Sequence, residues 1–451
     1  MKLPRVTISG ARGIVGQDLT VESALCLARA FARLLGKGTV VVGRDARGSG
    51  AMIQAAVEAG LMAGGCDVLH VGLAPTPTVG IMVRERGAAG GVNVTASHNP
   101  PQWNALKFYH DKGLFLGADQ LKQLVDLTRE RADHASAETC GHRADDPTAF
   151  QTHCRQVLRN IDSAAIASRT YRVAVDGCRS VGGVFLPRLL RELGCEVIEL
   201  DCQPDGRFTR PLEPVPSSLG SLCECVRDKG CAVGFAVDPD ADRLSLVDEG
   251  GVAIGEEYTL ALAVAHVLLR DGGGTAVVNL STSMMVDAAA ALAGGRVVRT
   301  PIGEANVVDA VLRENAGIGG EGNGGVIDPR IHPGRDALAG AALILEAMAL
   351  SGRPLSGLAA QLPKTTMLKD KVAVESFPPT DWVFQAAHAV THASTDTTDG
   401  LKVIYEDGWY HIRPSNTEPI LRIMAEATSE ERACRLLETA RKMAESLVDC
   451  S

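Results

Sequence analysis

The side chains best suited to chemistry lie in two short polar segments that are far apart in the sequence. In the first segment, residues 95–100, Ser97 offers a hydroxyl group that could act as a nucleophile. In the second, Asp238, Asp240 and Asp242 place three carboxylates at alternate positions, and hard oxygen ligands suit a small divalent cation. Together, the two segments indicate an enzyme in which a serine carries a phosphoryl group whose charge a metal neutralises.

The surroundings of Ser97 are typical of a ligand-binding turn. The apolar, glycine-rich residues 90–94 predict a strand whose carboxyl end holds Ser97, and Pro100 prevents continuation as a helix. The alternative is a serine that only satisfies hydrogen bonds within the turn. His98 is a further catalytic candidate, but neighbouring side chains normally point apart, so we do not expect a simple Ser97–His98 pair.

The three aspartates also have the spacing of a calcium EF-hand loop, with Glu249 at its twelfth position. Two features contradict this alternative: Arg243 stands where that loop needs glycine, and residues 233–237 and 244–247 are apolar runs typical of strands. Three carboxylates without a compensating charge would repel one another. We therefore predict a turn between two strands that holds one Mg²⁺ ion.

Two later loops concentrate groups that recognise sugars and phosphates. Residues 319–325 form a glycine-rich loop whose Glu321 and Asn323 suit sugar hydroxyls, with a plain turn as the alternative. A loop near the end of the chain gathers the donors that a phosphate dianion needs, with a helix-capping turn as the alternative. Its members are Arg413, Ser415, Asn416 and Thr417, with Arg422 behind them. Arg12, Arg44 and Arg47 add positive charge near the first strands, and we expect Arg44 and Arg47 to form structural ion pairs.

A strand–helix–strand pattern that occurs three times must position these loops. In each copy a β-branched run ends at a small or polar residue, a helix follows, and glycine precedes the next strand. Any α/β protein can produce similar units, but three copies favour three related α/β domains with mixed, mostly parallel sheets. The copies are 39–43, 50–63 and 66–71; 171–176, 184–193 and 195–200; and 275–279, 284–292 and 296–299.

The end of the chain has a different pattern and predicts a small α+β domain. Strands are expected at 401–405, 409–413 and 421–425, before a helix over 429–448. We expect the four domains to surround one cleft, and the last to be mobile. Their predicted bounds are 1–145, 146–255, 256–365 and 366–451.

The composition is that of a soluble globular protein. Of 451 residues, 45% are hydrophobic and 22% are charged. The net charge of −9 argues against nucleic-acid and anionic-membrane partners. The 12 cysteines form no C-x-x-C pair, and the sequence lacks a leader and a long apolar run, so we expect reduced thiols and a cytoplasmic protein. Either a monomer or a homodimer is expected.

The four loops, in this order, resemble those of the α-D-phosphohexomutase superfamily, which includes phosphoglucomutases, phosphomannomutases and phosphoglucosamine mutases. The resemblance covers essentially the whole chain, including residues 9–13 and 43–47. It implies that Ser97 is phosphorylated in the resting enzyme and that a phosphosugar passes through a hexose bisphosphate, which also serves as activator. The implied roles are Mg²⁺ binding by Ser97, Asp238, Asp240 and Asp242; phosphoryl transfer at Arg12, Lys107 and Arg243; sugar binding by Glu321 and Asn323; and phosphate binding by Arg413, Ser415, Asn416 and Thr417.

Two departures from the family pattern affect the expected chemistry. Many relatives carry serine at the position of Asn323 and histidine at that of Gly325, which leaves one acid–base role to Lys107 or, less directly, to His332. Residues 300–306 also lack the basic residues of some relatives. The Asn-Gly-Gly sequence resembles archaeal-type branches and favours phosphoglucosamine mutase, with phosphomannomutase or phosphoglucomutase activity next. A Mg²⁺-dependent phosphatase and a non-catalytic sugar-phosphate sensor are the remaining alternatives.

Overall fold

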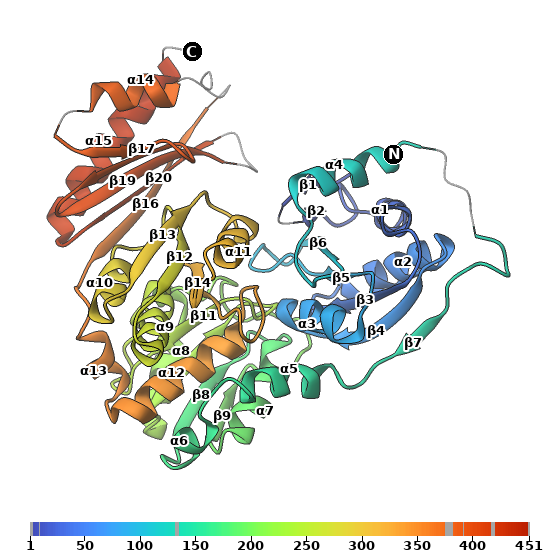
Figure 1. The fold of residues 1–451 in the computed structure, drawn as a ribbon, viewed down its shortest axis with the longest axis horizontal. Helices are drawn as coiled ribbons and strands as arrows, with labels where there is room; N and C mark the ends of the chain where they lie inside the picture. The colour runs from blue at the N-terminus through green and yellow to red at the C-terminus, as the bar shows by residue number, and fades with distance from the viewer. Residues whose placement is uncertain are drawn as a thin grey trace.

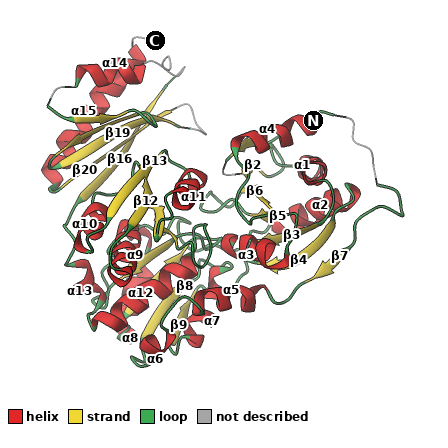
Figure 2. Cartoon of the chain, in the orientation of Figure 1, coloured by secondary structure: helices red, strands yellow, loops and turns green. Residues whose placement is uncertain are grey.

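The described residues of this computed structural model, 3–8, 10–130, 135–374, 382–390, 392–415 and 420–449, form four β-sheets. Each sheet belongs to a unit that also contains helices (Figure 2). The first and fourth units lie at separate ends of the molecule, with the second and third units between them (Figure 1). No helix in the described part of the chain is both long and apolar enough to span a bilayer.

The first unit contains a mixed sheet with helices on both faces. Its strands, in spatial order, are β1 (Arg5–Thr7), β2 (Gly10–Ile14), β6 (Trp103–His110), β5 (Gly90–Val94), β3 (Thr39–Arg44), β4 (Asp67–Leu73) and β7 (Arg143–Asp145). Its helices are α1 (Val21–Leu35), α2 (Gly50–Ala63), α3 (Thr76–Arg86) and α4 (Ala118–Leu127).

Strand β3 explains why both faces of this sheet are covered. Val40 and Val42 point into a core that contains Ile53 of α2. Val41 points to the other face and joins a core that contains Val79 of α3. Because successive side chains of a strand alternate between faces, its continuous apolar run needs helices on both sides. The predicted β3–α2–β4 unit is confirmed, and β3 and β4 are parallel.

The second and third units share one sheet arrangement. Three neighbouring strands are parallel, and a fourth strand at one edge is antiparallel to its neighbour. The predicted β8–α7–β9 and β12–α10–β13 units are confirmed. The second unit has β11 (Leu244–Val247), β10 (Val233–Val237), β8 (Arg172–Asp176) and β9 (Glu196–Leu200), with α5 (Ala149–Leu158), α6 (Ser163–Ala167), α7 (Gly182–Glu192) and α8 (Gly220–Lys229). The third has β13 (Arg296–Thr300), β12 (Thr275–Asn279), β14 (Ile318–Glu321) and β15 (Gly325–Ile327), with α9 (Glu256–Asp271), α10 (Met285–Leu292), α11 (Glu304–Arg313), α12 (Ala337–Ser351) and α13 (Leu355–Ala359).

Helix α12 packs the second and third units together, and contacts between α3 and α5 extend this packed body to the first unit. Every residue from Ala337 to Ala349 is buried, as expected for a helix that is apolar all round apart from Glu346. The helix contacts α5, α6 and α7 as well as α9 of its own unit. At its start, Asp336 caps the helix by accepting hydrogen bonds from the backbone N–H groups of Leu338 and Ala339.

A buried histidine reinforces this junction. Nδ1 of His153, a residue of α5, lies 2.8 Å from the Thr78 hydroxyl in α3. Nε2 of the same imidazole lies 2.7 Å from Asp336 Oδ2. All three residues are almost completely buried. The arrangement resembles a hydroxyl–histidine–carboxylate triad, but its burial excludes a substrate, so its role is to hold α3, α5 and α12 together.

The fourth unit has an antiparallel sheet, and the predicted α+β class is confirmed. Its expected strands and final helix occur, and sequence reasoning missed its two edge strands and first helix. The strands, in spatial order, are β16 (Thr366–Ala373), β20 (Ile420–Ala427), β19 (Gly408–Pro414), β18 (Leu401–Tyr405) and β17 (Ser394–Asp396), with helices α14 (Trp382–Ala389) and α15 (Glu430–Asp449).

Replacement of the junction histidine should weaken the packed body. We expect His153→Ala to lower the free energy of unfolding by about 3 kcal/mol, because it leaves the buried Asp336 carboxylate without its partner. Denaturant unfolding followed by circular dichroism measures the change. His142→Ala is the control, since that side chain is 89% exposed. Equal stability of the two variants would contradict the structural role of His153.

Candidate functional site

The predicted site loops follow the carboxyl ends of central strands, where open α/β sheets bind ligands. The turn with Ser97 follows β5, and the loop with the three aspartates connects β10 to β11. The loop from Glu321 to Gly325 connects β14 to β15. Hydrogen bonds between these loops, described below, bring the first three units together at one place.

Arg47 shapes the turn that holds Ser97. Its buried guanidinium donates hydrogen bonds to the carbonyl oxygens of Ser97, Asn99 (2.7 Å), Pro100 (2.9 Å) and Trp103 (3.1 Å). These bonds stabilise a left-handed backbone at Ser97, where φ is 49°. Such a conformation is uncommon for a residue other than glycine and needs support from its surroundings.

Asp45 in turn fixes Arg47. The Asp45 carboxylate accepts from the Arg47 backbone N–H at 2.9 Å, from its Nε at 3.1 Å, and from the Thr95 hydroxyl at 2.6 Å. The predicted structural ion pair of Arg47 is therefore confirmed. Arg44 instead donates to the backbone carbonyl of Asp45 at 3.0 Å.

The Ser97 hydroxyl lies directly against the acidic loop. Its Oγ donates to Asp238 Oδ2 at 2.7 Å. Nδ1 of His98 lies 3.3 Å from Ser97 Oγ. The expectation that Ser97 and His98 point apart was wrong, because alternation holds for extended strands and Ser97 lies in a left-handed turn. The Arg243 charge, burial and the Arg12 charge lower the pKa of His98 well below its usual value. Its imidazole is therefore neutral at neutral pH.

Asp238, Asp240 and Asp242 converge within the buried loop, with ligand oxygens all within 4.8 Å of one another. Lys107 Nζ donates to Asp240 Oδ2 at 2.7 Å and to Asp242 Oδ2 at 3.3 Å, and the Thr76 hydroxyl also donates to Asp240 Oδ2. Among the described residues, no hydrogen-bond partner reaches Oδ1 of Asp240 or Oδ1 of Asp242. Two unpartnered, buried carboxylate oxygens fit a hard cation.

Burial and neighbouring charges shift the pKa values of this cluster in different directions. Burial, together with the charges of Asp242 and Asp240, raises the pKa of Asp238 well above its usual value. Burial opposes ionisation of Asp240, but the Lys107 charge and its hydrogen bonds hold that pKa low. Burial also opposes the Lys107 ammonium, yet the two carboxylates raise its pKa overall. Lys107 is therefore a fixed positive charge.

Two further arginines border the Ser97 turn. Arg12, in β2, donates through Nη1 to Asn99 Oδ1. Arg243 follows the third aspartate and donates through Nη1 to Glu213 Oε1 at 2.8 Å. Both predicted residues thus lie at the junction of the serine turn and the acidic loop.

The predicted sugar loop presents one fixed carboxylate and one unpartnered amide oxygen. Glu321 Oε1 accepts from Asn279 Nδ2 at 2.9 Å and from the Gly303 backbone N–H at 3.2 Å. Glu321 Oε2 accepts from Arg335 Nη1 at 2.8 Å. Within the described residues, Oδ1 of Asn323 is buried and has no hydrogen-bond partner. Sequence reasoning missed Arg335 and Thr76, which no motif marks.

The candidate phosphate loop is described only in part. Arg422 Nε donates to the Ser415 hydroxyl at 3.4 Å, and Arg413 Nε lies 3.5 Å from Asp399 Oδ2. Asp399 Oδ2 also accepts from the Ile302 backbone N–H of the third unit at 2.9 Å. Asn416 and Thr417 lie outside the described residues. The described part of the loop is thus linked to the third unit through Asp399.

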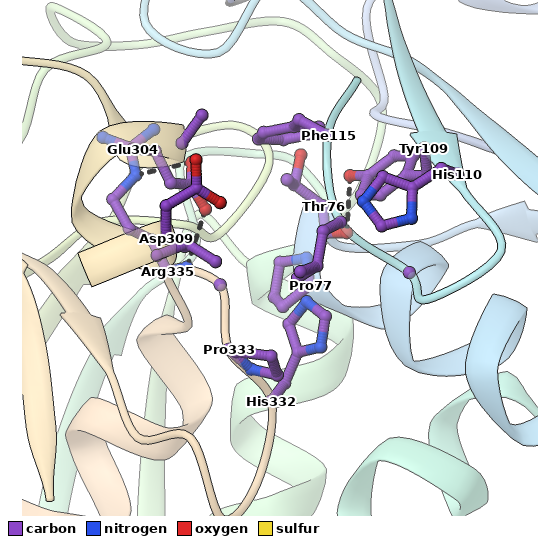
Figure 3. A pocket seen from close by; sticks show the side chains of 15 residues that line it. Thr76, Pro77, Tyr109, His110, Phe115, Glu304, Asp309, His332, Pro333 and Arg335 are labelled. Atoms are coloured by element: carbon purple, nitrogen blue, oxygen red, sulfur yellow. Dashed lines mark hydrogen bonds and ion pairs between the residues drawn. The ribbon is translucent and has the colours of Figure 1, made fainter. Parts of the chain in front are cut away.

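His332, a weaker acid–base candidate, faces a small cavity of about 40 Å³ that Thr76 and Arg335 also line. Figure 3 shows it below Pro77 and Tyr109, with Glu304 and Arg335 on the opposite wall. Burial and the Arg84 charge lower the pKa of His332 to about 3. A group with so low a pKa is a poor general base near neutral pH.

Comparison with known proteins agrees with this geometry. The phosphoglucomutase/phosphomannomutase family is matched by its alpha/beta/alpha domain I over residues 6–134, domain II over 150–251, domain III over 256–366 and its C-terminal domain over 370–443.

The similar proteins carry more than one name. A "Probable phosphoglucosamine mutase" of Methanopyrus kandleri is 38% identical over 95% of both chains. A "Phosphoglucomutase/phosphomannomutase" of Thermococcus kodakarensis is 39% identical over 97% of both. A solved phosphoglucomutase/phosphomannomutase family protein from Burkholderia thailandensis superposes with a TM-score of 0.85 at 26% identity over 98% of both chains. The chain therefore belongs to the phosphoglucomutase/phosphomannomutase family of phosphohexomutases, enzymes that move a phosphoryl group within a sugar phosphate.

Proposed function

We propose that this phosphohexomutase interconverts a hexose 6-phosphate and a hexose 1-phosphate, with Ser97 as the phosphoryl carrier. The observation that supports this most directly is the contact of Ser97 Oγ with Asp238 Oδ2, beside two buried carboxylate oxygens that accept no hydrogen bond from the described residues. A phosphoryl group on Ser97 would lie directly beside the carboxylates of the acidic loop. Its negative charge therefore requires compensation by a cation.

The proposed reaction has two phosphoryl transfers. In the first, the bond between phosphorus and Ser97 Oγ breaks while a bond to the oxygen of a free sugar hydroxyl forms. The hydroxyl gives up its proton and Ser97 Oγ takes one up, so the products are a hexose bisphosphate and a free serine. The sugar then turns around in the cleft, and its other phosphate returns to Ser97. Each transfer exchanges one oxygen–phosphorus bond for another, so alignment and electrostatic stabilisation supply most of the catalysis.

The positive charges near Ser97 have distinct proposed roles. Arg12 and Arg243 would neutralise the transferring group from two sides. Lys107 would act as a fixed charge and hydrogen-bond donor, since its raised pKa opposes loss of its proton. Neutral His98, 3.3 Å from Ser97 Oγ, would contribute a hydrogen bond to the same oxygen.

The acidic loop is the proposed Mg²⁺ site. Asp238, Asp240 and Asp242 would be its protein ligands, with a phosphate oxygen on Ser97 as a further ligand. The cation would supply charge neutralisation of the transferring phosphoryl group. Hard oxygen atoms and the absence of histidine or cysteine in residues 238–243 favour Mg²⁺ over a softer metal.

Each of the four proposed domains, 1–145, 146–255, 256–365 and 366–451, would supply one loop to a common cleft. The first two loops would carry the reacting phosphoryl group, and Glu321 and Asn323 would bind the ring hydroxyls. The last loop, with Arg413, Ser415, Asn416, Thr417 and Arg422, would bind the phosphate that is not being transferred.

Removal of the proposed carrier should abolish the reaction. We expect Ser97→Ala to lose measurable mutase turnover, because it removes the hydroxyl oxygen that would carry the phosphoryl group. Intact mass should show a phosphorylated fraction of the wild type that maps to Ser97 and is missing from the variant. Ser245→Ala, a buried serine of the neighbouring β11, is the control. Near-normal turnover by Ser97→Ala would contradict the mechanism, and release of inorganic phosphate in place of isomerisation would indicate a phosphatase.

Loss of one proposed metal ligand should weaken Mg²⁺ binding. Asp240→Asn keeps the shape of the side chain and removes its charge, so we expect Mg²⁺ affinity to fall at least about tenfold in calorimetry. Chelation should stop turnover of the wild type, and added Mg²⁺ should restore it. Asp248→Asn is the matched control, because Asp248 only accepts backbone N–H groups in the β11 hairpin. Full activity of Asp240→Asn in chelator would make the loop structural.

The proposed sugar is glucosamine phosphate, with mannose and glucose phosphates as the second candidates. The Asn-Gly-Gly sequence of the sugar loop and the names of the similar proteins support this order. We expect kcat/KM to be highest for glucosamine phosphate when each sugar is assayed with its own bisphosphate. A preference of more than about tenfold for mannose or glucose phosphate, roughly 1.4 kcal/mol in transition-state binding, would refute the amino-sugar assignment alone.

A further inference from the structure

We propose that Arg335 is a positioning residue that fixes the orientation of Asp242 and Glu321, and thereby joins the metal loop to the sugar loop. The inference rests on the proposed function for the meaning of those two loops. Its physical basis is a single buried guanidinium that binds carboxylates from two different units.

The Arg335 guanidinium uses three separate N–H directions. Nη2 donates to Asp242 Oδ2 at 2.7 Å, and Nη1 donates to Glu321 Oε2 at 2.8 Å. Nε donates to Glu304 Oε2 at 3.1 Å, as the dashed lines in Figure 3 mark for this pair. The planar fork of arginine can bind three carboxylates at once, whereas a lysine ammonium of the same charge lacks this fixed geometry.

These bonds determine which carboxylate oxygens remain available. Asp242 Oδ2 is held by Arg335 and Lys107, so its Oδ1 is the oxygen left without a hydrogen-bond partner among the described residues, with Arg243 Nε 3.9 Å away. Glu321 is held from both sides, by Arg335 on Oε2 and by Asn279 on Oε1. Arg335 therefore prevents rotation of either carboxylate and orients one toward the proposed metal and the other toward the proposed sugar.

The backbone around Arg335 holds the guanidinium in this place. The Arg335 N–H donates to Glu304 Oε1 at 2.8 Å, and the next residue, Asp336, is the N-cap of α12. Gly325 of the sugar loop leaves the space that the arginine stem occupies, since a Cβ there would come within 2.3 Å of Arg335 Cδ. Gly325→Ala should thus displace the guanidinium without removing its charge.

The test compares Arg335→Met, Arg335→Lys and Gly325→Ala with the wild type. We expect Arg335→Met to weaken Mg²⁺ affinity in calorimetry about 10–100-fold, the usual effect of losing a partner of a metal ligand. We also expect weaker binding of hexose 1-phosphate, measured by calorimetry and as a higher KM. Arg335→Lys should recover only part of either affinity, and Gly325→Ala should weaken both by a smaller factor.

Arg330→Met is the matched control because Arg330 lies in the same loop and pairs with the buried Asp328, away from the site carboxylates. It should lower stability and leave both affinities unchanged. Circular dichroism checks the fold of each variant, and if Arg335→Met does not fold, Arg335→Lys and Gly325→Ala decide the outcome. Wild-type affinity for either ligand in the folded variants would overturn the proposal. If the wild type itself lacks mutase turnover, the proposed function is wrong. The Mg²⁺ affinities of the variants, compared with that of the wild type, still test the role of Arg335.

Discussion

The burial of three carboxylates at one point is the constraint on which the rest of the site depends. Asp238, Asp240 and Asp242 are completely buried, and ionised groups in that position need cations and hydrogen-bond donors around them. Lys107 of the first unit and Arg335 of the third supply that charge from opposite sides. The acidic loop of the second unit is therefore also the electrostatic link among three units.

The fourth unit is attached by a smaller set of polar contacts. Glu426 accepts from the Ser283 hydroxyl and the Met284 backbone N–H at the start of α10, and from Trp409 Nε1 within its own unit. Lys402 Nζ donates to the Leu280 carbonyl, and burial together with the Arg299 charge lowers its pKa to about 7. Polar junctions of this kind permit relative domain motion more readily than a continuous apolar core does. The first three units share such a core, to which α12 contributes, so we expect any relative motion to involve the fourth.

The sequence by itself determined most elements and the chemistry of the site. β-branched runs separated by helix patterns identified β3, β8 and β12 with their helices and parallel partners, because a strand buried on both faces must be apolar throughout. The apolar runs beside residues 238–243 also located the metal loop between two strands. The strand β16 was missed because it alternates between half-buried and exposed residues, such as Lys369 and Lys371, and has no continuous apolar run.

Only the tertiary structure decided which side chains meet. Arg47 looked like a local ion pair, yet it also holds the turn of Ser97 through backbone carbonyls, and carbonyls leave no mark in a sequence. The Ser97–His98 contact depends on a left-handed φ that residue types did not predict. Arg335 lies 93 residues from Asp242 along the chain and reaches it because α12, whose N-cap directly follows Arg335, packs against the second unit as well as its own. Spacing thus identifies groups that act within one loop, whereas contacts between loops depend on how the units pack.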